Sequence, residues 1–237
     1  MLLFYIRHGD PIYDPDSLTP LGRRQAEAVS KRLALYGIDE IYASSSNRAR
    51  ETAQPTAELT KKPVQILDWC NESYVGQEFY THNETGEWRW LFQDEICRKL
   101  FASQEVLSLG QTWYEHKVFS APHIKKGVER VQRETYAFLK TLGYEHDEKE
   151  SFYHAVAPNE KRIALFAHEG FGMAFLSTVL DIPYSVFSTR FGLTHSGMSV
   201  VRFAGEKEVI PCLLQLSNDS HLYKEGLPTR YNGEIVF

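Results

Sequence analysis

The stretch MLLFYIRHGD, residues 1–10, decides the fold of this 237-residue chain. Residues 2–6 form a short apolar run of branched and aromatic side chains, which is typical of a buried strand. The run ends at Arg7, His8 and Gly9, and open α/β sheets bind their ligands just beyond the carboxyl ends of strands. An Arg and a His at that place favour an anion. The same residues are also compatible with an ordinary surface turn, so the rest of the chain must decide.

The sequence on both sides of a long central stretch predicts alternating strands and helices. Thr19 as N-cap and Pro20 as first helical residue begin the first helix, which Gly37 ends. We expect helices near residues 19–36, 48–60 and 171–180, and strands near 2–6, 38–43, 63–67, 162–167, 199–203 and 210–216. This alternation indicates an α/β protein.

The alternation is lost between residues 73 and 150, where aromatic side chains mix with charged ones. Helices are expected at residues 92–102 and 122–142. We interpret residues 73–150 as an insertion that covers the end of the sheet as a lid, within a single domain of residues 1–237. Its aromatic residues are also typical of the core of a helical subdomain.

Composition excludes several classes of function. The formal charge of −5 argues against a protein that binds nucleic acid or an anionic membrane. Three widely spaced cysteines without a CxxC pair indicate neither a disulfide framework nor a zinc site. No stretch approaches the ~20 apolar residues of a membrane span, and the apolar start is too short for a signal peptide. We expect a cytoplasmic protein that needs no cofactor and that can form a homodimer.

Three predicted strand ends bring similar residues to one edge of the sheet: Arg7 and His8, the segment from Ser44 to Arg48, and His168. Two guanidiniums and two imidazoles close together repel one another unless an anion sits among them. A phosphoryl group suits them because its oxygens accept bidentate bonds from arginine. A neutral histidine can attack phosphorus, arginines can stabilise the transition state, and a protonated carboxyl can supply a proton to the leaving alkoxide.

Several motifs resemble those of the histidine phosphatase superfamily, the phosphoglycerate-mutase-like proteins. They are Arg7-His8-Gly9, Leu18-Thr-Pro-Leu-Gly22-x-x-Gln-Ala26, Ser44-x-x-x-Arg48-Ala-x-x-Thr52-Ala53, His168-x-Gly170 and the segment at residues 218–222. The resemblance covers residues 1–72 and 160–222 and does not extend to the insertion. It implies a three-layer α/β/α sandwich with a mostly parallel central sheet.

The resemblance also implies roles for particular residues. His8 would accept the phosphoryl group, and Arg7, Arg48 and His168 would form the phosphate pocket. Glu72 would be the proton donor, although Asp10, Asp68 and Glu78 are also near in sequence.

Four further residues are expected to bind substrate. Asp14 and Thr19 lie where the first loop of the family often touches substrate, and Glu169 and Gly170 follow His168. The first loop also departs from the family pattern. Asp10-Pro11 replaces the more usual Glu/Gln-Thr/Ser pair, and Asp14 stands where Asn is common, which argues against a mutase form of the site.

The reaction expected from these residues is hydrolysis of a small phosphorylated metabolite through phosphohistidine. A phosphoglycerate-type mutase and a non-catalytic module that binds phosphate esters remain alternatives. A metal site at His8, Glu72 and His168 is disfavoured because no HExxH, HxH or Cys cluster is present and the arginines repel a cation. A serine hydrolase is disfavoured because there is no GxSxG motif.

Overall fold

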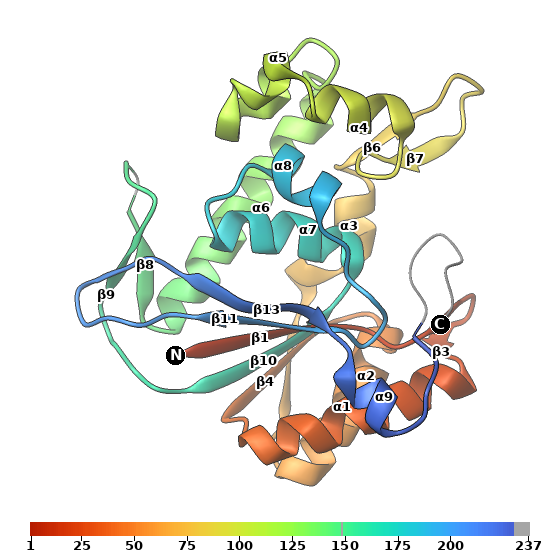
Figure 1. Ribbon diagram of the computed structural model, residues 1–237, viewed down its shortest axis with the longest axis vertical. Helices are drawn as coiled ribbons and strands as arrows, with labels where there is room; N and C mark the ends of the chain where they lie inside the picture. Colours follow the sequence, from red (N-terminus) through yellow and green to blue (C-terminus); the bar gives the residue numbers. More distant parts are fainter. Residues whose placement is uncertain (148, 230–237) are drawn as a thin grey trace.

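The computed structural model describes residues 1–147 and 149–229; Glu148, inside the predicted insertion, and residues 230–237 lie outside the described part. A six-stranded sheet forms the middle of the structure (Figure 1). Across the sheet its strands are β13 (Cys212–Asn218), β11 (Met198–Arg202), β1 (Leu2–Arg7), β10 (Arg162–Ala167), β4 (Glu40–Ser44) and β5 (Val64–Leu67). β1, β10, β4 and β5 run parallel, whereas β11 and β13 pair antiparallel.

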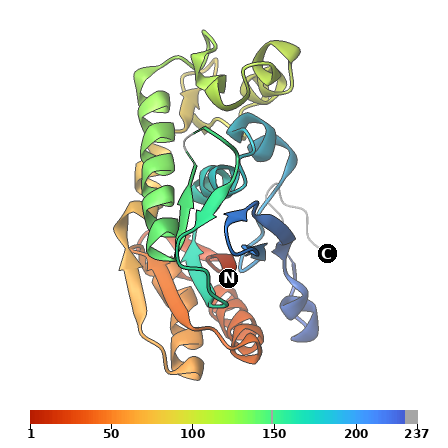
Figure 2. The ribbon, with the colours of Figure 1, turned by 90° about the vertical axis from the view of Figure 1, so that its left-hand side faces the viewer.

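Helices cover both faces of this sheet. They are α1 (Pro20–Tyr36), α2 (Asn47–Thr60), α3 (Glu72–Gly76), α4 (Glu95–Phe101), α5 (Gln104–Leu107), α6 (Pro122–Thr141), α7 (Glu169–Val179), α8 (Tyr184–Arg190) and α9 (Ser220–Lys224). Single 3₁₀ segments lie at Asp68–Cys70 and Gly110–Glu115. Figures 1 and 2 show α1 and α2 on one face of the sheet and α6 and α7 on the other.

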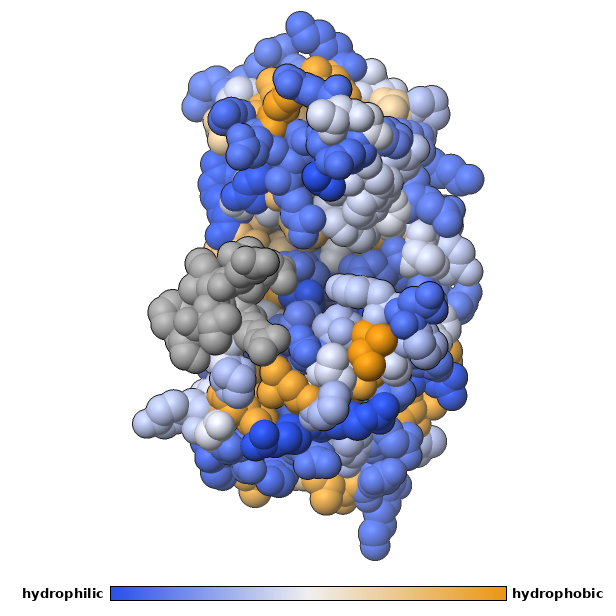
Figure 3. Space-filling view, turned by 90° about the vertical axis from the view of Figure 1, so that its right-hand side faces the viewer, coloured by the Kyte–Doolittle hydropathy of each residue, from blue (hydrophilic) through white to orange (hydrophobic). Residues whose placement is uncertain are grey.

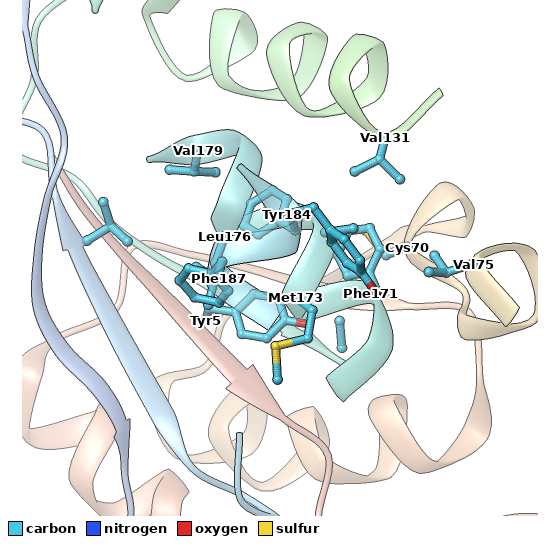
Figure 4. Close-up of a cluster of buried hydrophobic side chains, with 14 of the residues drawn as sticks. Tyr5, Cys70, Val75, Val131, Phe171, Met173, Leu176, Val179, Tyr184 and Phe187 are labelled. Carbon is cyan, nitrogen blue, oxygen red and sulfur yellow. The ribbon is translucent and has the colours of Figure 1, made fainter. Parts of the chain in front are cut away.

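The side chains of β1 explain the three layers, because successive residues of a strand point to opposite faces. Phe4 and Ile6 belong to a buried cluster shared with α1 and α2. Leu3 and Tyr5 belong to a larger cluster on the opposite face, shared with α6, α7 and α8. Figure 4 shows Tyr5 in this second cluster, on the side of the sheet that α7 covers. The three-layer α/β/α fold with a mostly parallel sheet is therefore confirmed.

The predicted insertion, residues 73–150, is divided between two roles. Phe79, Trp113 and Phe119 are almost fully buried, so many of its aromatic residues form core. α6 belongs to the layer over the sheet, where Phe138 packs edge-on against Tyr42 of β4 with ring centroids 5.1 Å apart. The hairpin of β6 (Tyr80–His82) and β7 (Trp88–Trp90) and the helices α4 and α5 lie beyond that layer (Figure 1).

Several short elements were not predicted. They are α3, α5, α8, α9, the hairpin of β2 (Pro11–Tyr13) and β3 (Asp16–Leu18), the β6–β7 hairpin, and a small sheet of β8 (Tyr144–His146), β9 (Tyr153–Ala155) and β12 (Glu208–Val209). Strands of two or three residues leave too few positions to establish a period in the sequence. Among the described residues, the helices include none that is long and apolar enough to cross a membrane.

Candidate active site

The loop that follows β1 is held tightly against α1 and α2. A Cβ on Gly9 would lie 2.6 Å from the carbonyl oxygen of Gly22, so these two glycines allow the loop and α1 to approach closely. The Gly9 N–H donates to Thr52 Oγ1 at 3.0 Å, and the Asp10 N–H donates to Gln25 Oε1 at 2.7 Å. The motif residues around Gly22 and Thr52 therefore fix the backbone on the C-terminal side of His8.

His8 is buried with one ring nitrogen available for chemistry. Its Nδ1 lies 2.7 Å from the Gly9 carbonyl oxygen, a group that can only accept, so Nδ1 carries the hydrogen and Nε2 keeps a lone pair. Burial lowers the pKa of His8 well below its ordinary value, and His168 and the arginines Arg7 and Arg48 lower this pKa further. At neutral pH the ring is therefore an uncharged potential nucleophile.

Arg48 lies in the first turn of α2, and two carboxylates pair with it. Its Nη1 is 2.8 Å from Asp16 Oδ1, and its Nη2 is 3.2 Å from Glu72 Oε2. Asp16 also accepts from the Asn47 N–H at 2.7 Å, which ties the β2–β3 hairpin to the start of α2. The Tyr13 ring of the same hairpin lies over the guanidinium at 5.5 Å. The hairpin thus sets the position of Arg48.

Arg7, at the end of β1, approaches the site from another side. Its Nη1 donates to the Leu193 carbonyl at 2.5 Å and lies 3.3 Å from Glu169 Oε2. Its Nη2 lies 2.9 Å from His195 Nε2, which must act as the acceptor because a guanidinium only donates. The His195 ring is 5.7 Å from the His8 ring. The expectation that the arginines need an anion to relieve repulsion was incomplete, because protein carboxylates already offset their charge.

His168 is the N-cap residue of α7, and two side chains hold it. The Tyr5 hydroxyl accepts from the His168 N–H at 3.2 Å and donates to the His168 carbonyl at 2.5 Å. Ser44 Oγ lies 2.8 Å from His168 Nε2. If the serine donates, the hydrogen of the ring is on Nδ1. The two rings of His8 and His168 have centroids 5.3 Å apart.

Glu72 begins α3 and joins the groups described so far. Its Oε1 accepts from the Gly170 N–H at 2.8 Å, and its Oε2 is 3.5 Å from His168 Nδ1. Burial raises the pKa of Glu72, whereas the charges of Arg48 and Arg7 oppose that rise. A raised carboxyl pKa is what a proton donor requires. The structure therefore brings Glu72 into contact with Arg48 and His168, and its role as proton donor stays a prediction.

The other candidate acids lie in different surroundings. Glu78 forms a bidentate pair with Arg130, with distances of 2.7 and 2.6 Å. Asp68 accepts from the hydroxyls of Ser45 and Tyr74. Asp10 is nearer the site, since its Oδ1 is 3.7 Å from His195 Nδ1. Of these carboxylates, Glu72 alone has a described contact with both Arg48 and His168.

The residues expected to bind substrate have different positions. Asp14 is exposed in the turn between β2 and β3, while Tyr13 and Asp16 of that hairpin contact Arg48. Thr19 caps α1 by accepting from the Gly22 N–H at 3.0 Å, and it donates to Asp10 Oδ2 at 2.7 Å. Gly170 contributes its N–H to Glu72, and Glu169 contacts Arg7, so these two belong to the site.

With Ser44 as the donor to His168 Nε2, two buried donors in the site have no hydrogen-bond partner within the described part of the chain: His168 Nδ1, which lies 3.5 Å from Glu72 Oε2, and Arg48 Nε. Buried polar groups are almost always paired, so an unpaired donor requires an explanation. A tetrahedral oxyanion beside His8 would accept from such donors. This arrangement favours phosphate binding at the histidine–arginine cluster, by which we mean Arg7, His8, Arg48 and His168.

A metal ion is the alternative occupant of this place. His8, Glu72 and His168 each offer one potential ligand atom, and these atoms lie within 4.8 Å of one another. The same three residues were the metal ligands considered from the sequence. The Arg7 and Arg48 guanidiniums oppose a divalent cation and can donate to phosphate oxygens, while Asp16, Glu72 and Glu169 offset part of their charge. The hydrogen-bond donors of the cluster therefore suit phosphate better than a cation.

Two hollows adjoin the cluster, on the side of the molecule where β1 ends. Figure 3 shows this side, with a largely hydrophilic hollow at mid-height. One hollow is a polar recess of about 570 Å³ whose lining includes Asp16, Arg48 and Glu72. The other is a cavity of about 830 Å³ whose lining includes Glu169 and Leu193. The recess thus reaches Arg48 itself, and the cavity reaches two residues that contact Arg7.

The histidine phosphatase superfamily (branch 1) matches residues 3–214, so the chain belongs to this superfamily, as its motifs predicted. Over 86 residues it is 34% identical to a probable phosphatase of Schizosaccharomyces pombe, a match that covers 32% of this chain and 41% of that protein.

Solved structures of named phosphatases share the fold. A phosphoserine phosphatase mutant of Entamoeba histolytica is 19% identical, with a TM-score of 0.61 and coverage of 93% of this chain and 98% of that one. A mycobacterial glucosyl-3-phosphoglycerate phosphatase is also 19% identical, with a TM-score of 0.57 and coverage of 92% and 98%. At this level of identity the likeness shows that the chain shares their fold.

Proposed function

We propose that this protein hydrolyses small phosphomonoesters through a phosphohistidine at His8. The observation that carries the proposal is the orientation of His8, whose Nδ1–H is bonded to the Gly9 carbonyl and whose Nε2 lone pair is available. The unpaired donors of His168 and Arg48 support the binding of a phosphoryl group beside it. Neutral imidazole attacks phosphorus without prior loss of a proton.

The reaction would proceed in two steps. His8 Nε2 forms a bond to phosphorus, the bond from phosphorus to the ester oxygen breaks, and protonated Glu72 gives its proton to the leaving alkoxide. Water then attacks the phosphohistidine, the Glu72 carboxylate takes a proton from it, and phosphate leaves as the bond to Nε2 breaks. Arg7 and Arg48 would stabilise the charge on the non-bridging oxygens in both transition states.

We also propose that the reaction needs no metal ion, because the two guanidiniums supply the positive charge that a metal would otherwise provide. Phosphate release would be measured with and without EDTA, followed by addition of Mg²⁺ or Zn²⁺. Unchanged rates are expected. A loss of activity that added metal restores would show that His8, Glu72 and His168 hold a catalytic ion instead.

The intermediate itself gives the sharpest test. Enzyme mixed with p-nitrophenyl phosphate would be quenched within the first turnover and analysed by mass spectrometry for phosphohistidine. We expect a phosphoryl group on His8 (the His8 label) in the wild type and no such group in His8→Ala. The control is His154→Ala, which removes a half-exposed histidine that pairs with Asp147 away from the site and should keep the label.

Two experimental outcomes would contradict the proposal and indicate a different function. Binding of phosphate esters without turnover would indicate a non-catalytic module. Transfer of the phosphoryl group from His8 to an added alcohol in preference to water would indicate the mutase.

A further inference from the structure

A third histidine lies beside the nucleophile, and the proposed reaction assigns no role to it. His195 lies between α8 and β11, with its ring centroid 5.7 Å from that of His8. Its Nε2 is 2.9 Å from Arg7 Nη2. Arginine donates and does not accept, so the His195 ring is neutral, with a lone pair on Nε2 and its hydrogen on Nδ1. The contact therefore joins a neutral acceptor to a cation of the histidine–arginine cluster.

The turn of residues 193–197 carries this histidine and is bonded to the end of β1. The Ser196 N–H donates to the His8 carbonyl at 3.1 Å, and the Arg7 N–H donates to the Gly197 carbonyl at 3.2 Å. Ser196 is fully buried, and its φ of 56° lies in the left-handed region that residues other than glycine rarely adopt. Such a conformation persists where the surroundings determine it, and it occurs often at functional sites. The turn therefore holds its histidine at a set place relative to the nucleophile.

The segment at residues 218–222, one of the motifs that resemble the family, supports the same turn. His221 is buried, and its Nε2 lies 3.0 Å from Ser196 Oγ. Burial lowers the pKa of His221 to about 4, so its ring is uncharged at neutral pH. The neighbouring Ser217 Oγ accepts from the Thr194 N–H at 2.6 Å. The motif thus acts on the site through the turn, by fixing its two ends.

The turn and its histidine hold both terminal nitrogens of the Arg7 guanidinium. Arg7 Nη1 donates to the Leu193 carbonyl at 2.5 Å, and Nη2 donates to His195 Nε2. A planar group bonded at both ends cannot rotate without losing a bond, so these contacts set the orientation of the guanidinium. The Glu169 carboxylate, 3.3 Å from Nη1, offsets part of the positive charge of Arg7, whereas a neutral imidazole orients Arg7 and leaves that charge in place.

We propose that His195 is a positioning residue that aims the Arg7 guanidinium at the phosphoryl group beside His8. As a neutral acceptor it leaves the charge of Arg7 available to the phosphoryl oxygens. Asp10 Oδ1 lies 3.7 Å from His195 Nδ1, on the side of the ring that carries the hydrogen, and keeps the lone pair of Nε2 toward Arg7. This inference rests on the proposed function, because it takes Arg7 as a ligand of the phosphoryl group.

Three substitutions of His195 identify the ring nitrogen that matters. The amide oxygen of Gln can occupy the place of Nε2, whereas the shorter Asn reaches only the place of Nδ1. We expect kcat/KM for p-nitrophenyl phosphate to fall about 10- to 100-fold in His195→Ala and in His195→Asn, because a misplaced Arg7 stabilises the transition state poorly. His195→Gln should recover most of this loss. Recovery by Asn and not by Gln, or an unchanged kcat/KM in His195→Ala, would overturn the proposal.

A double-mutant cycle shows whether His195 acts through Arg7. Once Arg7→Ala has removed the guanidinium, adding His195→Ala should change the rate of formation of the His8 label by less than about twofold. Binding of inorganic phosphate, measured by calorimetry, gives the same cycle where labelling is too slow. An undiminished effect of His195→Ala in the Arg7→Ala background would overturn the proposal.

The matched control is His146→Ala. The His146 side chain is 13% exposed, against 15% for His195, and it pairs with Asp181 beyond the C-terminal end of α7, whereas His168 lies at the N-terminal end. This control should lower the free energy of unfolding in urea and leave kcat/KM unchanged. Equal losses of kcat/KM in the two alanine variants would indicate a general loss of packing and contradict a positioning role.

Failure of this inference is distinguishable from failure of the proposed function. If the wild type forms the His8 label but the three His195 variants are equally active, only the role of His195 is refuted. If the wild type forms no label, the phosphatase activity is refuted. Phosphate binding that weakens in His195→Ala and recovers in His195→Gln would then still support the positioning of Arg7. Should His195→Ala not fold, the comparison of Gln with Asn decides.

Discussion

Replacing Glu72 with Gln tests its proposed role as proton donor and changes little else in the site. Gln has the same shape, and its amide oxygen can keep the 2.8 Å bond from the Gly170 N–H. Its NH₂ would then face Arg48 Nη2, where Glu72 Oε2 now lies at 3.2 Å. Arg48 loses one carboxylate partner but keeps Asp16 at 2.8 Å. The fold and the phosphate pocket should therefore persist while the proton is lost.

The magnitude depends on the leaving group. Positioned acids contribute about 10²- to 10⁴-fold, so kcat for an alkyl phosphate should fall by that factor, equivalent to about 3–5 kcal/mol in the barrier. p-Nitrophenolate leaves without a proton, so its release in the first turnover should change less than about tenfold. Stopped-flow measurement of that burst, beside steady-state release of phosphate from the alkyl ester, makes the comparison. Equal losses with both substrates would refute Glu72 as the acid.

The pH dependence of kcat/KM also tests the role of Glu72. His8 must be neutral to attack, and its pKa lies well below the ordinary value, so the acid limb of kcat/KM should lie below ~6.5. Glu72 must be protonated, and its raised pKa extends the protonated form above the ordinary carboxyl range of ~4.3. Activity should then decline as pH rises through the pKa of Glu72. In Glu72→Gln this alkaline limb should disappear from the residual rate; its persistence would assign the limb to another group.

Two further substitutions test how the site is held. Tyr5→Phe leaves the buried His168 N–H without its described partner, whereas the His168 carbonyl keeps the bond from the Gly172 N–H, so the free energy of unfolding should fall by about 1–3 kcal/mol and kcat/KM should fall with it. Urea denaturation and kinetics measure the two effects, and an unchanged kcat/KM would show that His168 needs no such support. Gly22→Ala would force a Cβ onto a backbone carbonyl of the loop after His8, at a cost of about 1–3 kcal/mol. Gly192→Ala, where a Cβ meets no atom within 4 Å, is the control, and equal stabilities would contradict the close approach.

The sequence predicted the long elements well because their signals are local. The apolar run of β1, the Thr19 cap and the Gly37 end of α1 each act within a few residues of one another, and the structure has them where expected. The left-handed backbone at Gly37, with φ of 74°, is the conformation that makes Gly a helix end.

Other parts of the site have no local signal. Asp16 stands in a Pro- and Asp-rich loop, which indicates only a turn, and its contact with Arg48 depends on how the β2–β3 hairpin lies over α2. His195 is in the segment between α8 and β11 and reaches Arg7 only because β11 pairs with β1. Glu169 was expected at the site, but its pairing with Arg7 and its place in the cavity depend on tertiary packing.

The position of β1 in the middle of the sheet has a consequence for folding during synthesis. Leu2 pairs with Arg162 on one side and with Arg202 on the other, so both neighbours of this strand are made about 160 residues or more later. Contacts so distant in sequence form slowly, because a long loop must close before they stabilise the chain. While the ribosome is still making the middle of the protein, β1 has neither partner strand, and its apolar side chains are a natural target for chaperones. His8, which directly follows β1, is therefore synthesised long before the two strands that flank β1.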